Sequence, residues 1–202
     1  MPFQPMGIQG AFVFTPVRHE DSRGHFQESF KLSFLEKELG LGFEVKQVNQ
    51  STSAKGVIRG IHFADNPPGQ AKYVSCLKGS IWDVVVDLRT ESPTFGKWEG
   101  VEVSADNGKS VLIAEGLGHG FLSLEEGSVV SYLSSEEYSP KSERQINPLD
   151  KDLAIEFSSF GSNFGVEEFL LSDQDKKAQG FKEALEFGLL PSNWKEAARQ
   201  LS

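Results

Sequence analysis

Short, strand-like apolar runs follow one another closely between residues 43 and 131, with turn-forming residues between them. Sixteen phenylalanines and twenty glycines in 202 residues suit strands joined by tight turns better than a helical bundle. Many short strands with Gly and Pro punctuation are typical of a β-sandwich or a jelly-roll barrel. The clearest runs cover residues 73–77, 81–88, 98–103, 110–114, 120–124 and 129–134.

Two of these runs, 73–77 and 81–88, flank the turn-like triplet Lys78-Gly79-Ser80. Apolar runs on both sides of a short turn are the usual signature of a β-hairpin. We therefore predict that these two runs pair directly with each other.

Helical signals are few and lie mainly in the tail. Ser33, with Glu36 three residues later, predicts a capping box, and Gly40 predicts the end of that short helix. Residues 176–187 and 193–201 also have helical spacing. The chain is thus predicted to be an all-β jelly-roll sandwich or barrel with short helices, mainly at the C-terminus. One domain is expected over residues 1–202, with a core from about 10 to 180 and a helical tail over 176–202.

The composition narrows the class of protein. A formal net charge of −9, without a Lys/Arg run, argues against a nucleic-acid binder, although a few clustered cations can still attract an anionic ligand. The single cysteine, Cys76, cannot form an internal disulfide and is expected to be a buried thiol. No apolar run approaches membrane-spanning length and no signal peptide is recognisable, so a cytoplasmic protein without membrane contact is expected.

Proton chemistry on an anionic substrate is suggested by Arg59, His62 and Lys72. Histidine titrates near neutral pH, arginine matches phosphate oxygens, and lysine offers a compact charge for a developing oxyanion. Gln47 and Asn49 share one face of a strand. Strict alternation, however, would separate Arg59 from His62 unless the strand bends near the intervening glycine. Three ordinary polar residues on strand edges are the competing interpretation.

Other polar clusters carry weaker signals. Each also has an ordinary structural explanation: a solvated turn, a satisfied core histidine, a half-buried tyrosine or a helix cap. A metal-binding cupin would need a second histidine two residues from His62, so no metal site is predicted. The clustered residues are Arg23, Phe26 and Glu28; His119 between glycines; Tyr132, Tyr138 and Glu143; and Asp173 and Asp175.

Taken together and in order, these segments resemble the dTDP-4-dehydrorhamnose 3,5-epimerase family, metal-free cupins of nucleotide-sugar metabolism. The resemblance covers about residues 10 to 180. The matching pieces are Asp21-Ser22-Arg23-Gly24 with Phe26 and Glu28, Gln47-Val48-Asn49-Gln50-Ser51, Arg59-Gly60-Ile61-His62-Phe63, Gln70-Ala71-Lys72, Asp83-Val84-Val85-Val86-Asp87-Leu88-Arg89, Ser92-Pro93-Thr94-Phe95-Gly96, Gly118-His119-Gly120-Phe121, Tyr132, Tyr138-Ser139-Pro140 and Ser172-Asp173-Gln174-Asp175.

The resemblance implies a cofactor-free epimerase that inverts C3 and C5 of dTDP-4-dehydro-6-deoxy-D-glucose. It makes His62 the base, Asp175 the partner that orients it, Tyr132 the acid, and Lys72 the cation near the C4 oxygen. It also implies a homodimer in which the first strands cross to the second subunit. The implied substrate-binding residues are Arg23, Phe26, Glu28, Gln47, Asn49, Arg59, His119, Tyr138 and Glu143.

Some positions depart from the family pattern, which leaves alternatives open. Ala64 stands where Gln is common. Gln174 stands where Lys or Arg is common, and the loss of that cation would weaken a phosphate contact or alter the nucleotide preference, so substrate identity is less secure than reaction type. A single-centre epimerase, acting at C3 or C5 alone, fits the same residues. A non-catalytic sugar-nucleotide-binding cupin would be expected to lack His62 or Tyr132, and both are present.

Overall fold

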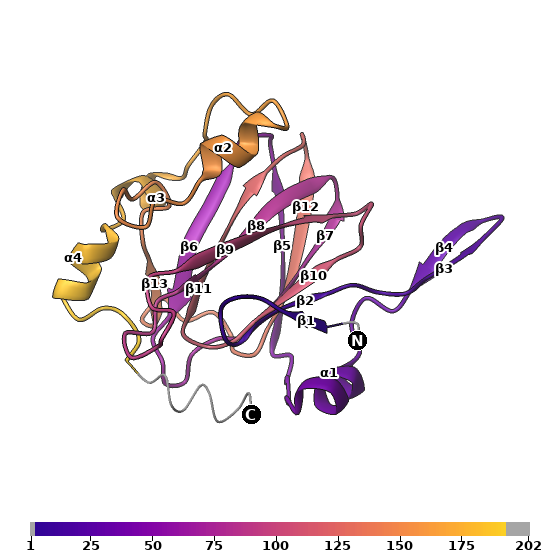
Figure 1. The fold of residues 1–202 in the computed structure, drawn as a ribbon, viewed down its shortest axis with the longest axis horizontal. Coiled ribbons are helices and arrows are strands. Elements are labelled where there is room, and N and C mark those ends of the chain that lie inside the picture. Colours follow the sequence, from indigo (N-terminus) through magenta and orange to yellow (C-terminus); the bar gives the residue numbers. More distant parts are fainter. Residues whose placement is uncertain (1–2, 193–202) are drawn as a thin grey trace.

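The computed structural model describes residues 3–192, and two antiparallel sheets dominate them (Figure 1). The predicted all-β architecture with short helices is confirmed. The six-stranded sheet has the order β1 (Phe3–Pro5), β2 (Ala11–Phe14), β10 (Ser110–Ile113), β7 (Lys72–Lys78), β12 (Ser128–Ser134) and β5 (Gln47–Ser53). The five-stranded sheet has the order β13 (Glu143–Gln145), β6 (Ile58–Ala64), β11 (Leu117–Ser123), β8 (Ser80–Asp87) and β9 (Trp98–Ser104).

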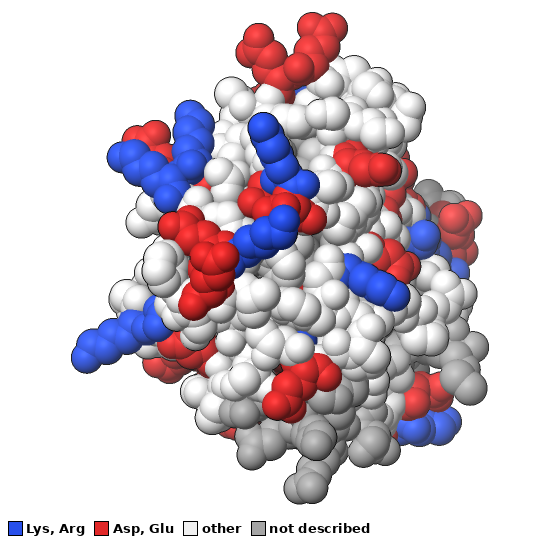
Figure 2. Space-filling view, turned by 60° about the vertical axis from the view of Figure 1, so that its left-hand side comes forward, with Lys and Arg blue, Asp and Glu red and all other residues white. Residues whose placement is uncertain are grey.

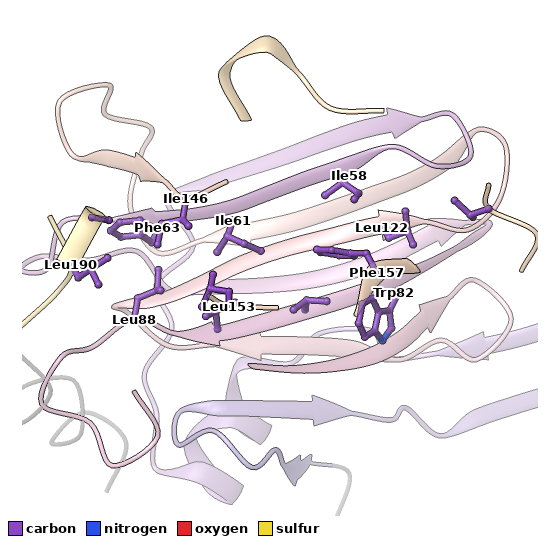
Figure 3. Close-up of a cluster of buried hydrophobic side chains, with 14 of the residues drawn as sticks. Ile58, Ile61, Phe63, Trp82, Leu88, Leu122, Ile146, Leu153, Phe157 and Leu190 are labelled. Atoms are coloured by element: carbon purple, nitrogen blue, oxygen red, sulfur yellow. The ribbon is translucent and has the colours of Figure 1, made fainter. Parts of the chain in front are cut away.

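The interior of the sandwich is formed by apolar side chains from both sheets, among them Val74, Val85, Phe121 and Val130. A second cluster covers the outer face of the five-stranded sheet and includes the ring of Trp82 (Figure 3). Strand β8 contributes to both clusters and is buried along its whole length. Burial on both faces explains why its sequence is a nearly continuous apolar run rather than an alternating one.

Helices cover the outer faces of both sheets. α2 (Phe157–Ser162) and α4 (Phe181–Glu186) pack on the five-stranded sheet, and α3 (Asp173–Lys177) contacts β6. α1 (Leu32–Leu39) packs Leu35 on the six-stranded sheet. Figure 2 shows the side of the molecule that carries α2 to α4, where acidic and basic side chains lie interspersed.

A two-stranded hairpin, β3 (Arg18–Asp21) and β4 (Gly24–Gln27), projects away from both sheets (Figure 1). The two strands pair only with each other among the described residues, and Phe26 is 67% exposed. We call residues 18–28, which include β3, β4 and the turn between them, the arm.

The predicted hairpin of residues 73–77 and 81–88 is wrong. The chain does turn at Gly79, which has a positive φ of 73°, but β7 belongs to the six-stranded sheet and β8 to the five-stranded one. Strand β7 pairs with β10 and β12, whereas β8 pairs with β9 and β11. The turn therefore carries the chain from one layer of the sandwich to the other. Turn residues mark a change of direction but do not identify the partner strands.

The helix predictions need two further corrections. Lys31, not Ser33, precedes α1, and no side-chain hydrogen bond caps this end, so the predicted capping box does not form. The predicted end at Gly40 is confirmed, because this residue has a φ of 69° and its N–H donates to the carbonyl of Glu36. Residues 176–187 do not form one helix: Ala178 is extended and separates α3 from α4. The helix predicted over 193–201 lies outside the described residues.

Candidate active site

A bulge in β6 brings Arg59 and His62 to the same face. His119 of β11 lies opposite His62, and Phe121 lies opposite Arg59, so β6 has one residue more than β11 between these pairs. Gly60 has a φ of 123°, and a Cβ atom there would lie 2.5 Å from the Cα of Gly120. Only glycine fits this conformation and this contact. The predicted possibility that the strand bends near its glycine is therefore confirmed.

The side chains on this face line a cavity of about 370 Å³ between the two sheets. Strands β5, β7 and β12 of one sheet and β6 and β13 of the other supply lining residues. The lining consists of Gln47, Asn49, His62, Gln70, Lys72, Tyr132, Tyr138 and Glu143. Seven of these eight are predicted site residues, whereas Gln70 was named only within a matching segment and had no predicted role.

His62 forms a hydrogen-bonded pair with Asp175, with 2.8 Å between Nε2 and Oδ1. Asp175 is 3% exposed. The hydroxyl of Ser172 donates to Oδ2, the other carboxylate oxygen of Asp175, at 2.9 Å. The backbone amide of Asp175 in turn donates to the Ser172 hydroxyl at 3.0 Å. Ser172, not Asp173, is thus the cap of α3. A carboxylate on Nε2 fixes the imidazole ring and leaves Nδ1 to exchange a proton.

Tyr132 reaches the same cavity from β12, in the sheet opposite to that of His62. Burial raises the pKa of its phenol, and the nearby carboxylate of Glu143 raises it further. The phenol is therefore protonated at neutral pH and able to donate a proton.

Lys72 is 8% exposed and lies on β7. Burial lowers the pKa of its ammonium group, while Glu143 and Asp83 oppose that shift. A partly desolvated cation in a narrow cavity interacts strongly with any negative charge that develops beside it.

A second imidazole–carboxylate pair stands next to the first. Nε2 of His119 lies 2.7 Å from Oδ2 of Asp83, and Asp83 is completely buried. Asp83 had no predicted role. Its position in the apolar run of β8 could have predicted a functional or structural pairing, because a buried acidic residue needs a buried partner.

The remaining predicted residues divide into two groups. Arg59 does not line the cavity; its Nε donates to the hydroxyl of Ser53 at 3.0 Å. The arm residues Arg23, Phe26 and Glu28 do not reach the cavity of their own chain. Arg23 pairs with Asp21, and Glu28 pairs with Lys31.

Among residues 3–192, no three His, Cys, Asp or Glu side chains are grouped so that they could hold a metal ion. In the same part of the chain, no helix is both long enough and apolar enough to cross a membrane.

Comparison with known proteins identifies the family. The family model described as dTDP-4-dehydrorhamnose 3,5-epimerase matches residues 5–183. The chain belongs to the dTDP-4-dehydrorhamnose 3,5-epimerase family. It is therefore an enzyme, an epimerase, as the resemblance implied.

Individual members of this epimerase family are similar over almost the whole chain. The dTDP-4-dehydrorhamnose 3,5-epimerase of Mycolicibacterium smegmatis is 44% identical over 192 residues, which are 95% of this chain and 92% of the relative. The dTDP-4-dehydrorhamnose 3-epimerase of Streptomyces niveus is 42% identical, with 95% and 89% covered. The solved structure of an epimerase from Mycobacterium tuberculosis superposes with a TM-score of 0.92 at 40% identity, covering 100% of this chain and 98% of that one.

Proposed function

We propose that this epimerase inverts both C3 and C5 of dTDP-4-dehydro-6-deoxy-D-glucose, giving dTDP-4-dehydro-L-rhamnose. The observation that carries the proposal is the arrangement of His62 and Tyr132, which enter one cavity from opposite sheets. Inversion of a carbon needs a proton to leave from one face and return to the other. A base and an acid on opposite walls meet that requirement.

The first step is removal of a proton from the carbon next to the C4 ketone. Nδ1 of His62 accepts this proton, and Asp175 stabilises the imidazolium that forms. The electron pair of the broken C–H bond moves toward the C4 oxygen and gives an enolate. The ammonium of Lys72 favours this enolate over the neutral ketone.

The second step returns a proton from Tyr132 to the opposite face of the same carbon, and the carbonyl group reforms. The raised pKa of Tyr132 keeps its phenol protonated until the enolate accepts the proton. The ketone activates C3 and C5 equally, since both are adjacent to C4. One base and one acid can therefore serve both centres in succession, once the imidazolium of His62 has released its proton to solvent and the phenolate of Tyr132 has taken one up.

The nucleotide part of the substrate requires contacts beyond the sugar cavity. The guanidinium of Arg59, from the same strand as His62, suits the diphosphate, and Tyr138, which is 62% exposed, offers a ring for the base to stack on. Gln47, Asn49, His119 and Glu143 complete the set proposed for the sugar and nucleotide.

We further propose that the enzyme acts as a cytoplasmic homodimer. The arm projects with Phe26 exposed, and β5 ends the six-stranded sheet with β12 as its neighbour. An arm laid along β5 of a second subunit would extend that sheet. It would also bring Arg23, Phe26 and Glu28 toward the other subunit's cavity. The buried free thiol of Cys76 suits a reducing compartment.

A single-centre epimerase is the second candidate, because the relative from Streptomyces niveus, named a 3-epimerase, is about as similar as the double epimerases. Proton NMR of the substrate in heavy water, without added metal, separates the two. Loss of both the C3 and the C5 proton signals supports double inversion, and loss of one signal supports the single-centre reaction. Loss of neither, with binding retained, contradicts both.

A further inference from the structure

Two side-chain amides on β5 connect the segment after β12 to the proposed acid. The backbone N–H of Tyr138 donates to Oε1 of Gln47 at 2.8 Å, and Nε2 of Gln47 donates to Oδ1 of Asn49 at 2.7 Å. Asn49 lies directly opposite Tyr132 in the pairing of β5 with β12. All four residues line the catalytic cavity. We call the side chains of Gln47 and Asn49, bonded in this order, the amide relay.

The first donor sets the direction of every hydrogen bond in the amide relay. A backbone N–H can only donate, so the atom of Gln47 that faces Tyr138 must be its carbonyl oxygen. The nitrogen of the Gln47 amide therefore faces Asn49, where the acceptor must again be the carbonyl oxygen. Asn49 is left with its NH₂ group to offer to Tyr132, its neighbour across the strands.

The effect of Asn49 on Tyr132 agrees with this direction. Burial raises the pKa of the Tyr132 phenol, whereas a hydrogen bond with the side chain of Asn49 lowers it. A group that donates to the phenol oxygen favours the ionised form, so a lowered pKa is the effect expected of a donor. A phenol has one hydrogen. When its oxygen accepts from Asn49, that hydrogen is free to point at another acceptor in the cavity.

We propose that Gln47 and Asn49 are positioning residues that direct the hydrogen of the Tyr132 hydroxyl toward the substrate carbon. This inference rests on the proposed function, in which Tyr132 is the acid. After proton transfer, the same N–H of Asn49 stabilises the phenolate that remains. The second N–H of each amide stays available for the sugar, so the role is compatible with the substrate contacts proposed above.

Asn49→Asp reverses the last hydrogen bond and keeps the earlier ones. Its Oδ1 can still accept from Gln47, but a carboxylate oxygen replaces the donor that faces Tyr132. The phenol hydrogen should then point at the carboxylate instead of the substrate. In the heavy-water assay at saturating substrate, we expect loss of the substrate protons to continue at close to the wild-type rate. Formation of inverted product per exchange event should fall by about tenfold or more.

Gln47→Glu acts one hydrogen bond earlier. Its carboxylate can accept from Tyr138 but cannot donate to Asn49, so Asn49 loses the partner that fixes its orientation. Inversion per exchange event should again fall. The matched control is Gln4→Glu, the same amide-to-carboxylate change at an exposed position on β1, at the opposite edge of the six-stranded sheet from β5. It should leave both quantities unchanged.

Two results of the heavy-water assay would overturn the proposal. If exchange and inversion fell together in Asn49→Asp, this residue would act on substrate binding alone. If neither fell, the direction of its hydrogen bond would not matter to the acid.

Carbon NMR of the tyrosine Cζ atom, which bears the hydroxyl, tests the amide relay without turnover. The chain has three tyrosines, and Tyr132→Phe identifies the signal of Tyr132. We expect this signal to shift in Asn49→Asp and in Gln47→Glu and to stay in place in Gln4→Glu. An unmoved Cζ signal in the first two variants would refute the relay. A wild-type enzyme that exchanges neither the C3 nor the C5 proton would refute the proposed function instead.

Discussion

His62 and Asp175 are 113 positions apart in the sequence, yet their side chains meet at 2.8 Å. The histidine comes from a strand in the first third of the chain, and the aspartate from a short helix near its end. The pairing therefore depends on α3 docking against β6, and it gives the proposed mechanism its most direct test.

Asp175→Asn keeps the shape of the side chain but removes the charge that stabilises the imidazolium. We expect the rate of solvent deuterium exchange into the substrate to fall by about 10²- to 10⁴-fold, with dTDP binding nearly unchanged. Asp173→Asn, an exposed position in the same helix, is the matched control and should exchange normally. Exchange at the wild-type rate in Asp175→Asn would refute the orienting role.

Tyr132→Phe removes the proposed acid while leaving the base intact. Loss of the substrate proton should persist, while formation of the inverted product should fall by about 10²-fold or more. NMR in heavy water follows both quantities in one sample. Tyr73→Phe provides the comparison, because the hydroxyl of Tyr73 donates to the carbonyl of Ser29 outside the cavity. That variant should lose stability, by about 1 kcal/mol, and keep its activity.

Glu143→Gln should shift the alkaline limb of the pH–rate profile. The carboxylate of Glu143 adds to the raised pKa of Tyr132, so its neutralisation should let the phenol ionise at lower pH. The alkaline limb of the profile, where activity falls because the Tyr132 phenol has lost its proton, should then lie at lower pH. Glu137→Gln, at an exposed neighbouring position, should leave the limb in place. A limb that is identical in the two variants would mean that Glu143 does not influence the phenol.

Stability in alkali should depend on Cys76. Burial raises the pKa of this thiol from 9.0 to about 11. The unfolded chain loses the thiol proton first, so the stabilising contribution is complete below pH 9 and is lost as the pH rises toward 11. In urea denaturation, wild type should lose about 1–3 kcal/mol more than Cys76→Ala over this range. Parallel losses in the two proteins would contradict the shift.

Gly60→Ala should disrupt the bulge that aligns His62 with Arg59. The new methyl group would lie 2.5 Å from the backbone of Gly120, at a φ of 123°. Gly24 has a similar φ of 128° but no atom within 4 Å of an added Cβ, so Gly24→Ala measures the backbone effect alone. We expect Gly60→Ala to be less stable than Gly24→Ala by about 1–3 kcal/mol. Equal stabilities would show that the close contact relaxes freely.

Local patterns in the sequence predict much of this fold, because the pattern of apolar residues along a strand reflects which of its faces are buried. The runs that became β9, β10, β11 and β12 were each recognisable from apolar content and turn residues. The partner of each strand was not recognisable, since pairing is decided by the whole sandwich. The turn at Gly79 therefore suggested a hairpin where the chain changes layers.

The candidate site shows the same division. Ordered motifs, read through the family resemblance, named most of the residues that line the catalytic cavity. Local sequence could not show that Arg59 and His62 share a face, because one extra residue in β6 resets the alternation. It also could not reveal the pairing of Asp83 with His119, since 36 positions separate them.

The positions of His62 and Tyr132 on different sheets have a consequence for how activity is acquired during folding. Neither layer alone contains both the base and the acid, so a partly folded chain with one completed sheet cannot catalyse the epimerisation. Turnover can begin only after the two layers have closed on each other. The first appearance of product in a refolding experiment would therefore time the joining of the layers, rather than the formation of either one.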